Sequence, residues 1–568
     1  MGVSSRVAIG LAALLASSGL AAVVAAPPAG AATTTITVDN FGDGVPDATP
    51  CLTPIPGQCT LRDAFFAAST VGTDVEIDVP GGSGQTISLV PPFGAPFFAP
   101  ADGTDSLTVH GNGVTIDQTT TNAQVLVAVT SGSFTLDGVT LTGGNTVGFP
   151  TGPGAALLNT AGPITLSNST VSGNTAAPPS GGAGAIIAAG VFSAPVTLDN
   201  VTVTDNQITT TGRGADFGIV EGSSVAVTNS RFTNNTDTAN FDPAGGVIDA
   251  GPDPSTVTGS TFTGNTNAAQ NGSDEADGVL DTADTTVTNS TFTANTVSAT
   301  TGEADGVLDT ADTTLTASLV AGNTISSGDD AFAAVFPNQL TMTASTVANN
   351  TVTGGAVAAG GGVVTTHLVN VQNSTITNNT ASGPTANGGG IDQDLNFLDL
   401  SAQTHDGHWS RSHADVGAAQ TTTGVNLTYA TVVDNTATTG ANLRVSSLET
   451  SASVVALPHG GANCVVAGAI TSAGYNFSDD ASCQLTATGD LQNAGDPGLA
   501  ALASAGGPTP TRVPHPTSLL VDAIPVAVCQ TIGVFVDQRG VTRPQGHGCD
   551  IGAVEIVPPP PPVPRFTG

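Results

Sequence analysis

Asparagine recurs along this chain at an almost constant interval. Ten Asn residues are separated by 27 to 32 residues, except for a last gap of 56, which is two intervals of 28. Nine of the ten are followed by Thr, and from the second onward apolar residues stand three and eight positions before each Asn. The ten are Asn145, Asn174, Asn206, Asn235, Asn265, Asn295, Asn323, Asn350, Asn379 and Asn435. Self-similarity at a fixed period predicts one structural unit that is stacked many times.

The unit consists of short strands and turns. In a typical repeat, Val287 and Phe292 each stand between Thr residues, which is the alternation of a half-buried strand. These two positions are five residues apart, and a continuous strand would put them on opposite faces. We therefore predict a corner between them, at Asn289 and Ser290.

Three short strands and three corners in each repeat describe one coil of an all-β parallel β-helix. Successive coils would hydrogen-bond at a spacing of about 4.8 Å. Like residues then stack on like, so the corner Asn side chains can bond their copies one coil away. The same stacking predicts an inward column made of Phe232, Phe262 and Phe292.

The ends of the chain differ from the repeats. Residues 1–32 have the pattern of a secretory signal, with Arg6 before an Ala-rich apolar run and small residues at 29–31. A retained membrane helix is the alternative for this stretch, and no later run is long and apolar enough to span a bilayer. We expect a secreted or surface-associated mature chain. The further segments are an N-terminal cap (33–75), β-helix repeats (76–490), a C-terminal cap (491–557) and a Pro-rich tail (558–568).

Both open ends of a solenoid core need a cover. Residues 60–68 are the best helix of the mature chain, with Thr60 as N-cap and Asp63 three positions on, so we expect an N-terminal plug. The six Cys allow 15 connectivities. In an exported chain their local spacing predicts three disulfides that pin the ends: Cys51–Cys59, Cys464–Cys483 and Cys529–Cys549.

The charge of the mature chain narrows the choice of partners. Without Arg6 it has nine Arg and no Lys against 45 acidic residues, a net charge of 9 − 45 = −36. This field excludes nucleic acid, and it repels anionic polysaccharides unless a cation bridges them. One Trp and two Tyr offer few platforms for sugar rings. We expect a monomer whose ligand is an unidentified surface or polysaccharide.

Both ends resemble a known group of bacterial proteins. Residues 59–64, Cys-Thr-Leu-Arg-Asp-Ala, resemble the signature that opens the CSLREA-domain proteins. Residues 537–540, 543–544 and 548–555 resemble the choice-of-anchor Q domain, and 472–476 and 506–509 fit the same pattern. The resemblance implies a right-handed, pectate-lyase-like β-helix that is secreted or displayed on a surface, and it implies no particular reaction. No sorting motif follows Pro564, so covalent attachment to a wall is not expected.

Enzymes that act on polysaccharides also use this fold, so paired carboxylates in the sequence are candidates for catalysis. Gly328-Asp329-Asp330 resembles an element of the polygalacturonases, and paired carboxylates can do acid–base chemistry. The other elements of that active site are missing, and the same residues also suit an ordinary turn. Asp329 and Asp330 are therefore candidates with a structural alternative.

Two segments outside the regular repeats contain possible metal ligands. Residues 404–415 interrupt the Asn pattern and hold three His residues that could bind Zn²⁺, although an irregular surface insertion is the alternative. Near the N-terminus, three Asp residues stand at intervals of four and Gly residues flank the middle one, which suits Ca²⁺ but does not match a complete Ca²⁺-binding loop. These candidates are His405, His408, His413, Asp39, Asp43 and Asp47.

Two nearly identical acidic blocks, 275–284 and 303–312, are offset by 28 residues. A period of 28 stacks each acid of the first block on its copy, and Asp249 can extend one column by another coil. Carboxylates this close repel each other, and a bridging Ca²⁺ would relieve the repulsion. The alternative is that all of them point into solvent. The stacked pairs are Glu275/Glu303, Asp277/Asp305, Asp281/Asp309 and Asp284/Asp312, with Asp277, Asp281, Asp305 and Asp309 as the metal candidates.

The duplicated blocks favour a structural or adhesive β-helix scaffold without catalysis. Duplicating a coil extends a surface, whereas an active site needs unlike residues on neighbouring coils. The alternative function is a polysaccharide lyase or glycoside hydrolase. The acidic blocks suggest Ca²⁺ as a cofactor.

Overall fold

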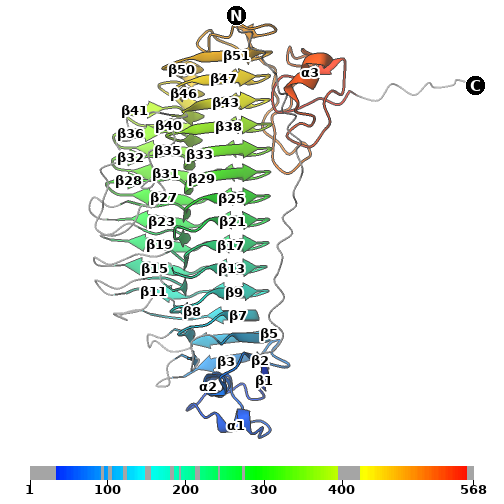
Figure 1. Cartoon of the computed structure of the whole chain (residues 1–568). Helices are drawn as coiled ribbons and strands as arrows, with labels where there is room; N and C mark the ends of the chain where they lie inside the picture. Colours follow the sequence, from blue (N-terminus) through cyan, green and yellow to red (C-terminus); the bar gives the residue numbers. More distant parts are fainter. Residues whose placement is uncertain are drawn as a thin grey trace, which may run out of the picture.

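The computed structural model describes residues 33–558, apart from 91–94, 100–104, 119–124, 147–154, 179–183, 191–192, 211–217, 241–243, 271–274 and 394–422. This part of the chain is a parallel β-solenoid with few helices (Figure 1). The predicted all-β parallel β-helix is thus confirmed, although the strands form four columns where three strands in each repeat were predicted.

The strands form four columns, in which each strand pairs in parallel with its copy in the next coil. The first column comprises β1 (Thr34–Thr37), β2 (Val75–Asp78), β5 (Leu107–Gln118), β7 (Phe134–Thr142), β9 (Ile164–Ser167), β13 (Val196–Asp199), β17 (Val225–Thr228), β21 (Ser255–Thr258), β25 (Thr285–Thr288), β29 (Leu308–Thr316), β33 (Val335–Thr343), β38 (Leu368–Gln372), β43 (Gly424–Thr428), β47 (Leu448–Ser451) and β51 (Ile470–Gly474). The second comprises β3 (Thr86–Leu89), β10 (Thr170–Ser172), β14 (Thr202–Thr204), β18 (Arg231–Thr233), β22 (Thr261–Thr263), β26 (Thr291–Thr293), β30 (Leu319–Ala321), β34 (Thr346–Ala348), β39 (Thr375–Thr377), β44 (Thr431–Val433), β48 (Val454–Ala456), β52 (Phe477–Ser478) and β53 (Leu491–Gln492).

The other two columns close each coil. The third comprises β11 (Thr175–Ala176), β15 (Gln207–Thr210), β19 (Thr236–Ala239), β23 (Thr266–Ala269), β27 (Thr296–Ala299), β31 (Thr324–Ser327), β35 (Thr351–Gly354), β40 (Thr380–Ser382), β45 (Thr436–Ala437) and β49 (His459–Gly460). The fourth comprises β4 (Phe97–Phe98), β6 (Val127–Val129), β8 (Leu157–Asn159), β12 (Ile187–Ala189), β16 (Val220–Gly222), β20 (Ile248–Ala250), β24 (Leu280–Thr282), the first halves of β29 and β33, β37 (Val363–Val364), β42 (Ile391–Asp392), β46 (Leu443–Val445) and β50 (Cys464–Val466). Between the third and fourth columns, β28 (Glu303–Ala304), β32 (Asp330–Ala331), β36 (Val357–Ala359) and β41 (Thr385–Asn387) pair in a smaller sheet.

The corner predicted between the first and second columns is present. Asn289 has φ of 50°, a left-handed conformation that Asn adopts more readily than most residues. The next residue, Ser290, donates its backbone N–H to the hydroxyl of Ser318 in the following coil, at 3.0 Å. A Ser ladder therefore follows this edge of the solenoid.

The predicted Asn ladder follows the corner between the second and third columns. Asn265 illustrates one rung: its side-chain oxygen accepts from the side-chain amide of Asn235, and its own amide donates to Asn295, both at 3.0 Å. The ladder continues beyond the periodic set, through Asn442 and Asn463.

The prediction that Asn145, the first Asn of the periodic set, belongs to the ladder is wrong. Asn145 pairs with Thr175, and it is the backbone N–H of Gly144 that donates to the side chain of Asn174. The corner of this early coil is thus shifted by one residue, and Gly144 occupies the ladder position.

Apolar side chains fill the interior. The rings of Phe232 and Phe262 stack with centroids 4.4 Å apart, and those of Phe262 and Phe292 with centroids 4.6 Å apart. All three rings are buried, which confirms the inward Phe column.

At the N-terminal end, α1 (Thr49–Leu52) precedes the predicted plug helix, α2 (Leu61–Val71). Thr60 caps α2 in a capping box with Asp63, as predicted. Phe65 on the buried face of α2 meets the ring of Phe134 edge-on, with centroids 6.3 Å apart. The helix therefore packs against the core of the first coils.

At the other end, the predicted C-terminal cap is divided into two segments: one covers the last coils and the other does not. Cys483 and Leu485 are buried in the main core, next to the last coils. β53 (Leu491–Gln492) still stacks on the last coil, and residues 495–557, with α3 (Val526–Ile532), β54 (Ile524–Pro525) and β55 (Gly548–Cys549), lie along the side of the solenoid (Figure 1). We call residues 495–557 the lateral segment.

The lateral segment is bonded to the second column. The side chain of Gln538 accepts from the Thr375 hydroxyl at 2.6 Å, and its amide donates to Ser345 O at 3.1 Å and to the Thr346 hydroxyl at 2.8 Å. The backbone N–H of Ala553 donates to the hydroxyl of Thr431 at 3.0 Å. These contacts span three neighbouring coils.

All three predicted disulfides are present: Cys51–Cys59, Cys464–Cys483 and Cys529–Cys549. In the part of the chain that the structure describes, no helix is long and apolar enough to cross a membrane.

Candidate metal centre

Four acidic residues stack in the fourth column because the strands hold them in register. Each is the pairing partner of the next in consecutive coils, and all four are buried. They are Glu221 in β16, Asp249 in β20, Asp281 in β24 and Asp309 in β29. The stacking predicted for Asp249, Asp281 and Asp309 is confirmed, and the column also contains Glu221, which the periodicity of the acidic blocks did not include.

The chain that leads from the third to the fourth column passes close over this acidic column. A Cβ added to Gly278 would lie 3.0 Å from the Cβ of Asp309, and one added to Gly306 would lie 2.9 Å from the Cβ of Phe336. Such a close approach requires Gly. The duplicated Asp-Gly pairs thereby bring Asp277 and Asp305 next to the fourth column.

The two acidic blocks stack as predicted. Ala276 and Ala304 form a parallel bridge, so Glu275 lies beside Glu303, and Asp277 beside Asp305, one coil apart. The last pair, Asp284 and Asp312, lies outside the buried cluster, where the backbone N–H of Asp312 donates to Asp284 at 3.3 Å.

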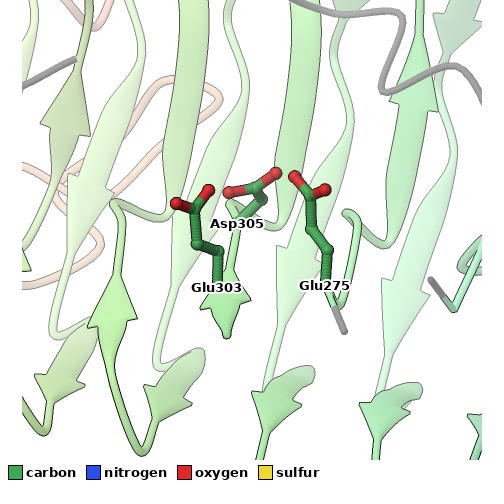
Figure 2. A group of neighbouring side chains, drawn as sticks. All are labelled: Glu275, Glu303 and Asp305. Carbon is green, nitrogen blue, oxygen red and sulfur yellow. The ribbon is translucent and has the colours of Figure 1, made fainter. Parts of the chain in front are cut away.

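The carboxylates of the blocks converge in two groups. In the inner group, Asp277, Asp305 and Asp309 each place one oxygen within 4.8 Å of the others. In the outer group, Glu275, Glu303 and Asp305 do the same, and their carboxylates turn toward one another from neighbouring coils (Figure 2). Asp305 belongs to both groups. The inner group thereby joins Asp277 to two residues of the following coil.

Two of these carboxylates contain a buried oxygen without a hydrogen-bond partner among the described residues. These atoms are Oδ1 of Asp277 and Oδ1 of Asp305. The two residues are only 5% and 2% exposed, so bulk water does not solvate these oxygens fully. A buried carboxylate in this condition needs a proton or a cation.

The electrostatics of the cluster agree with this requirement. Burial raises the pKa of Asp277 well above its ordinary value, and repulsion from Asp281 and Glu275 raises it further. Burial, followed by repulsion from Glu275 and Asp309, raises the pKa of Asp305 in the same way. Burial, with the charges of Glu275 and Asp330, raises the pKa of Glu303 to about 7. Without a cation, Asp277, Asp305 and Glu303 therefore bind protons more tightly than ordinary carboxylates do.

Two inward polar residues on the third column support the covering chain. Asn267 donates to the backbone oxygens of Ala244 at 2.9 Å and of Asp277 at 2.6 Å, and Asp237 accepts from the N–H of Gly246 at 2.9 Å. Both occupy the column that holds Ile208 and Val297 in neighbouring coils. A polar residue in an otherwise apolar column is the sequence signal that would have identified them.

The donor set fits a hard cation. Both groups consist of carboxylate oxygens, which suit Ca²⁺, and neither contains the His or Cys that Zn²⁺ prefers. Two oxygens on one Ca²⁺ can be at most about 5 Å apart, twice the Ca–O distance of roughly 2.3–2.6 Å. The separations within each group satisfy this limit.

Asp329 and Asp330 lie at the edge of this cluster. Asp329 accepts from the backbone N–H of Gly302 at 3.0 Å, and its own N–H donates to Ser327 at 2.9 Å, as in a turn. Asp330 is the pairing partner of Glu303, so it continues the outer acidic row by one coil. Burial raises its pKa. A catalytic role for the pair stays a prediction.

The N-terminal Asp residues serve separate contacts within the cap. Asp39 accepts from the N–H groups of Gly57 and Cys59 at 2.7 and 2.9 Å, and Asp43 forms an ion pair with Arg62 at 2.7 Å. Asp47 accepts from the N–H of Thr49 at 2.9 Å. The three carboxylates therefore hold different segments of the cap, and they form no three-residue metal group in the described part of the chain. The remaining metal candidates, His405, His408 and His413, lie outside the described residues.

No protein-family model, no curated protein and no solved structure matches this chain. The fold and the acidic cluster define it as a parallel β-solenoid with a candidate cation centre. The resemblance of its ends to CSLREA and choice-of-anchor Q proteins stays an expectation.

Proposed function

We propose that this protein is an exported, non-catalytic β-solenoid scaffold, structural or adhesive, in which Ca²⁺ ties neighbouring coils together. The observation that carries the proposal is the pair of buried, unpartnered oxygens on Asp277 and Asp305. These two residues come from different coils, so a cation bound between them would link the coils directly.

The energetics favour a bound cation. An uncompensated buried charge costs several kcal/mol, and here the carboxylates also repel one another. A cation that binds only the folded protein stabilises it by about 2.7 kcal/mol at a hundredfold excess over Kd. In millimolar Ca²⁺ outside a cell, the cluster would stabilise the solenoid.

The adhesive part of the proposal is supported by one outer face of the first column. Thr side chains at equivalent outward positions of four consecutive coils are exposed. They are Thr256, Thr286, Thr314 and Thr341. This row is uncharged in a strongly acidic protein and repeats at about 4.8 Å, so it suits a flat, repetitive ligand better than a single small molecule.

Thermal melting tests the role of Ca²⁺. We expect the metal-stripped protein to melt several degrees higher in millimolar Ca²⁺, at constant ionic strength to remove simple screening. Mg²⁺ should have a smaller effect, because it demands six ligands in near-ideal octahedral geometry. The variant Asp305→Asn should lose the Ca²⁺ effect, whereas the matched control Asp284→Asn, in the same block but outside the cluster, should retain it. Equal melting temperatures of the wild-type protein with and without Ca²⁺ would refute the proposal.

One observation favours the alternative, an enzyme that acts on polysaccharides. Glu303 is half-buried, its pKa is raised to about 7, and Asp330 lies beside it. A carboxylic acid of this kind can protonate a glycosidic oxygen. Assays for reducing sugars and unsaturated uronides across a polysaccharide panel distinguish the two functions. Activity that disappears in Glu303→Gln would establish the enzyme.

A further inference from the structure

We infer that the acidic cluster is a dinuclear centre, in which two cations share the carboxylate of Asp305. This inference rests on the proposed function and adds the number of ions, their separate ligands and their different exposure. The inner ion would bind Asp277, Asp305 and Asp309, and the outer ion Glu275, Glu303 and Asp305.

The geometry provides two positions. Each group brings three carboxylate oxygens within 4.8 Å of one another, and Asp305 is the residue common to both. A carboxylate has two oxygens with about four lone pairs, so one Asp can bind two ions. The unpartnered Oδ1 atoms of Asp277 and Asp305, on residues more than nine-tenths buried, point independently to a missing ligand.

The charge of the cluster also calls for more than one ion. The two groups together contain five carboxylates. One divalent cation leaves three negative charges uncompensated, and two leave one. Asp281 lies close enough to Asp277, and Asp330 close enough to Glu303, for their charges to act on those residues. Each position therefore has a further acidic neighbour of its own.

The two positions differ in their access to solvent. All three residues of the inner group are at most 5% exposed. The outer group includes Glu303, which is half-buried, and its two Glu side chains are longer and more flexible than Asp. We expect the inner ion to exchange slowly with chelator and the outer ion to exchange rapidly.

Equilibrium dialysis of the metal-stripped full chain against Ca²⁺ counts the ions. Other acidic sites on the surface can bind Ca²⁺, so the informative quantity is the number of ions that each variant loses relative to the wild-type protein. We expect Asp305→Asn to lose two ions per chain, and Asp309→Asn and Glu303→Gln to lose one each. The control Asp284→Asn should lose none. When a chelator is added to the loaded protein, the ion whose binding depends on Glu303 should leave first.

The outcomes separate this inference from the proposed function. If Asp305→Asn loses one ion, the shared pair is refuted and a single Ca²⁺ site remains. If it loses none, both proposals fail. Folding of each variant is checked by far-UV circular dichroism, and we expect metal-free Asp305→Asn to melt above the metal-free wild type because an amide cannot carry the charge that burial and the neighbouring carboxylates disfavour. Coupled electron-spin signals from two bound Mn²⁺ ions provide a second measurement, and uncoupled signals alone would contradict the dinuclear centre.

Discussion

Single polar residues in buried positions distinguish this solenoid from a simple repeat. Asp237 and Asn267 stand where neighbouring coils have apolar residues, and they bond the backbone that covers the acidic column. The sequence predicted which acids stack on which, because stacking follows from the period. It did not predict that Asp277 meets Asp309 of the next coil, because that contact depends on how the chain crosses over at Gly278.

The buried carboxylate of Asp550, which lies outside the acidic cluster, gives a prediction for a single residue. Asp550 is 1% exposed and accepts from the N–H groups of Asp522 and Ile556 at 2.7 and 2.6 Å. Burial raises its pKa from 3.8 to about 6. The folded protein then binds more protons than the unfolded chain between these two values, so Asp550 lowers the free energy of unfolding as pH rises through this window.

We therefore expect the free energy of unfolding of the wild-type protein to fall by up to about 3 kcal/mol, relative to that of Asp550→Asn, between pH 4 and pH 7. The variant lacks an acceptor for one backbone N–H and is less stable at low pH, so the difference between the two proteins should narrow as pH rises. Denaturant unfolding at both pH values measures it. A difference that is independent of pH would contradict the shift at Asp550.

At the scale of the elements, the ladders were predictable and their limits were not. The Asn period identified the corner from Asn174 to Asn435, because each amide bonds its copy in the next coil. The period failed at Asn145, where Gly143 with φ of 73° and Gly144 form the corner one residue earlier. A one-residue shift leaves the spacing almost unchanged, so counting alone could not detect it.

The ladder predicts a large effect for a single Asn. Asn265→Ala removes the acceptor of the Asn235 amide and the donor to Asn295 and to the backbone oxygen of Phe232. Each buried group left unpaired costs about 1–3 kcal/mol. We therefore expect the free energy of unfolding, measured in urea, to fall by roughly 3–5 kcal/mol. The control Asn378→Gly, at an exposed left-handed position, should change stability by less than about 0.5 kcal/mol. A small effect at Asn265 would mean that the ladder contributes little.

At the scale of the whole molecule, the sequence located the plug helix and the disulfides, because their signals are local. The position of the lateral segment could not be predicted in this way. Gln538 bonds Thr375, which is 163 residues earlier, and Ser345, which is 193 residues earlier. No period or local pattern relates residues at such distances, so only the folded structure shows that residues 495–557 lie beside the second column.

Gln538 tests this arrangement. Gln538→Ala removes its bonds to Ser345, Thr346 and Thr375, so we expect the lateral segment to open more often while the coils stay intact. Hydrogen exchange should become at least tenfold faster in residues 506–557 and remain unchanged in β22 and β26. The control Gln545→Ala, whose side chain bonds Thr542 of its own segment, should leave the exchange of β34 and β39 unchanged. Uniform acceleration along the whole chain after Gln538→Ala would instead indicate that the segment and the coils unfold together.

The lateral segment also determines how the molecule bears mechanical load. A pull on the chain at Val557 does not reach the last coil first. It enters at the side of the solenoid, where Gln538 and Ala553 hold the coils of Ser345, Thr375 and Thr431. The force then acts in shear on hydrogen bonds to three coils at once, so the bonds share the load and do not break one after another. Under tension along its axis, the solenoid is therefore reinforced beside the lateral segment and weakest in the coils that this segment does not cover.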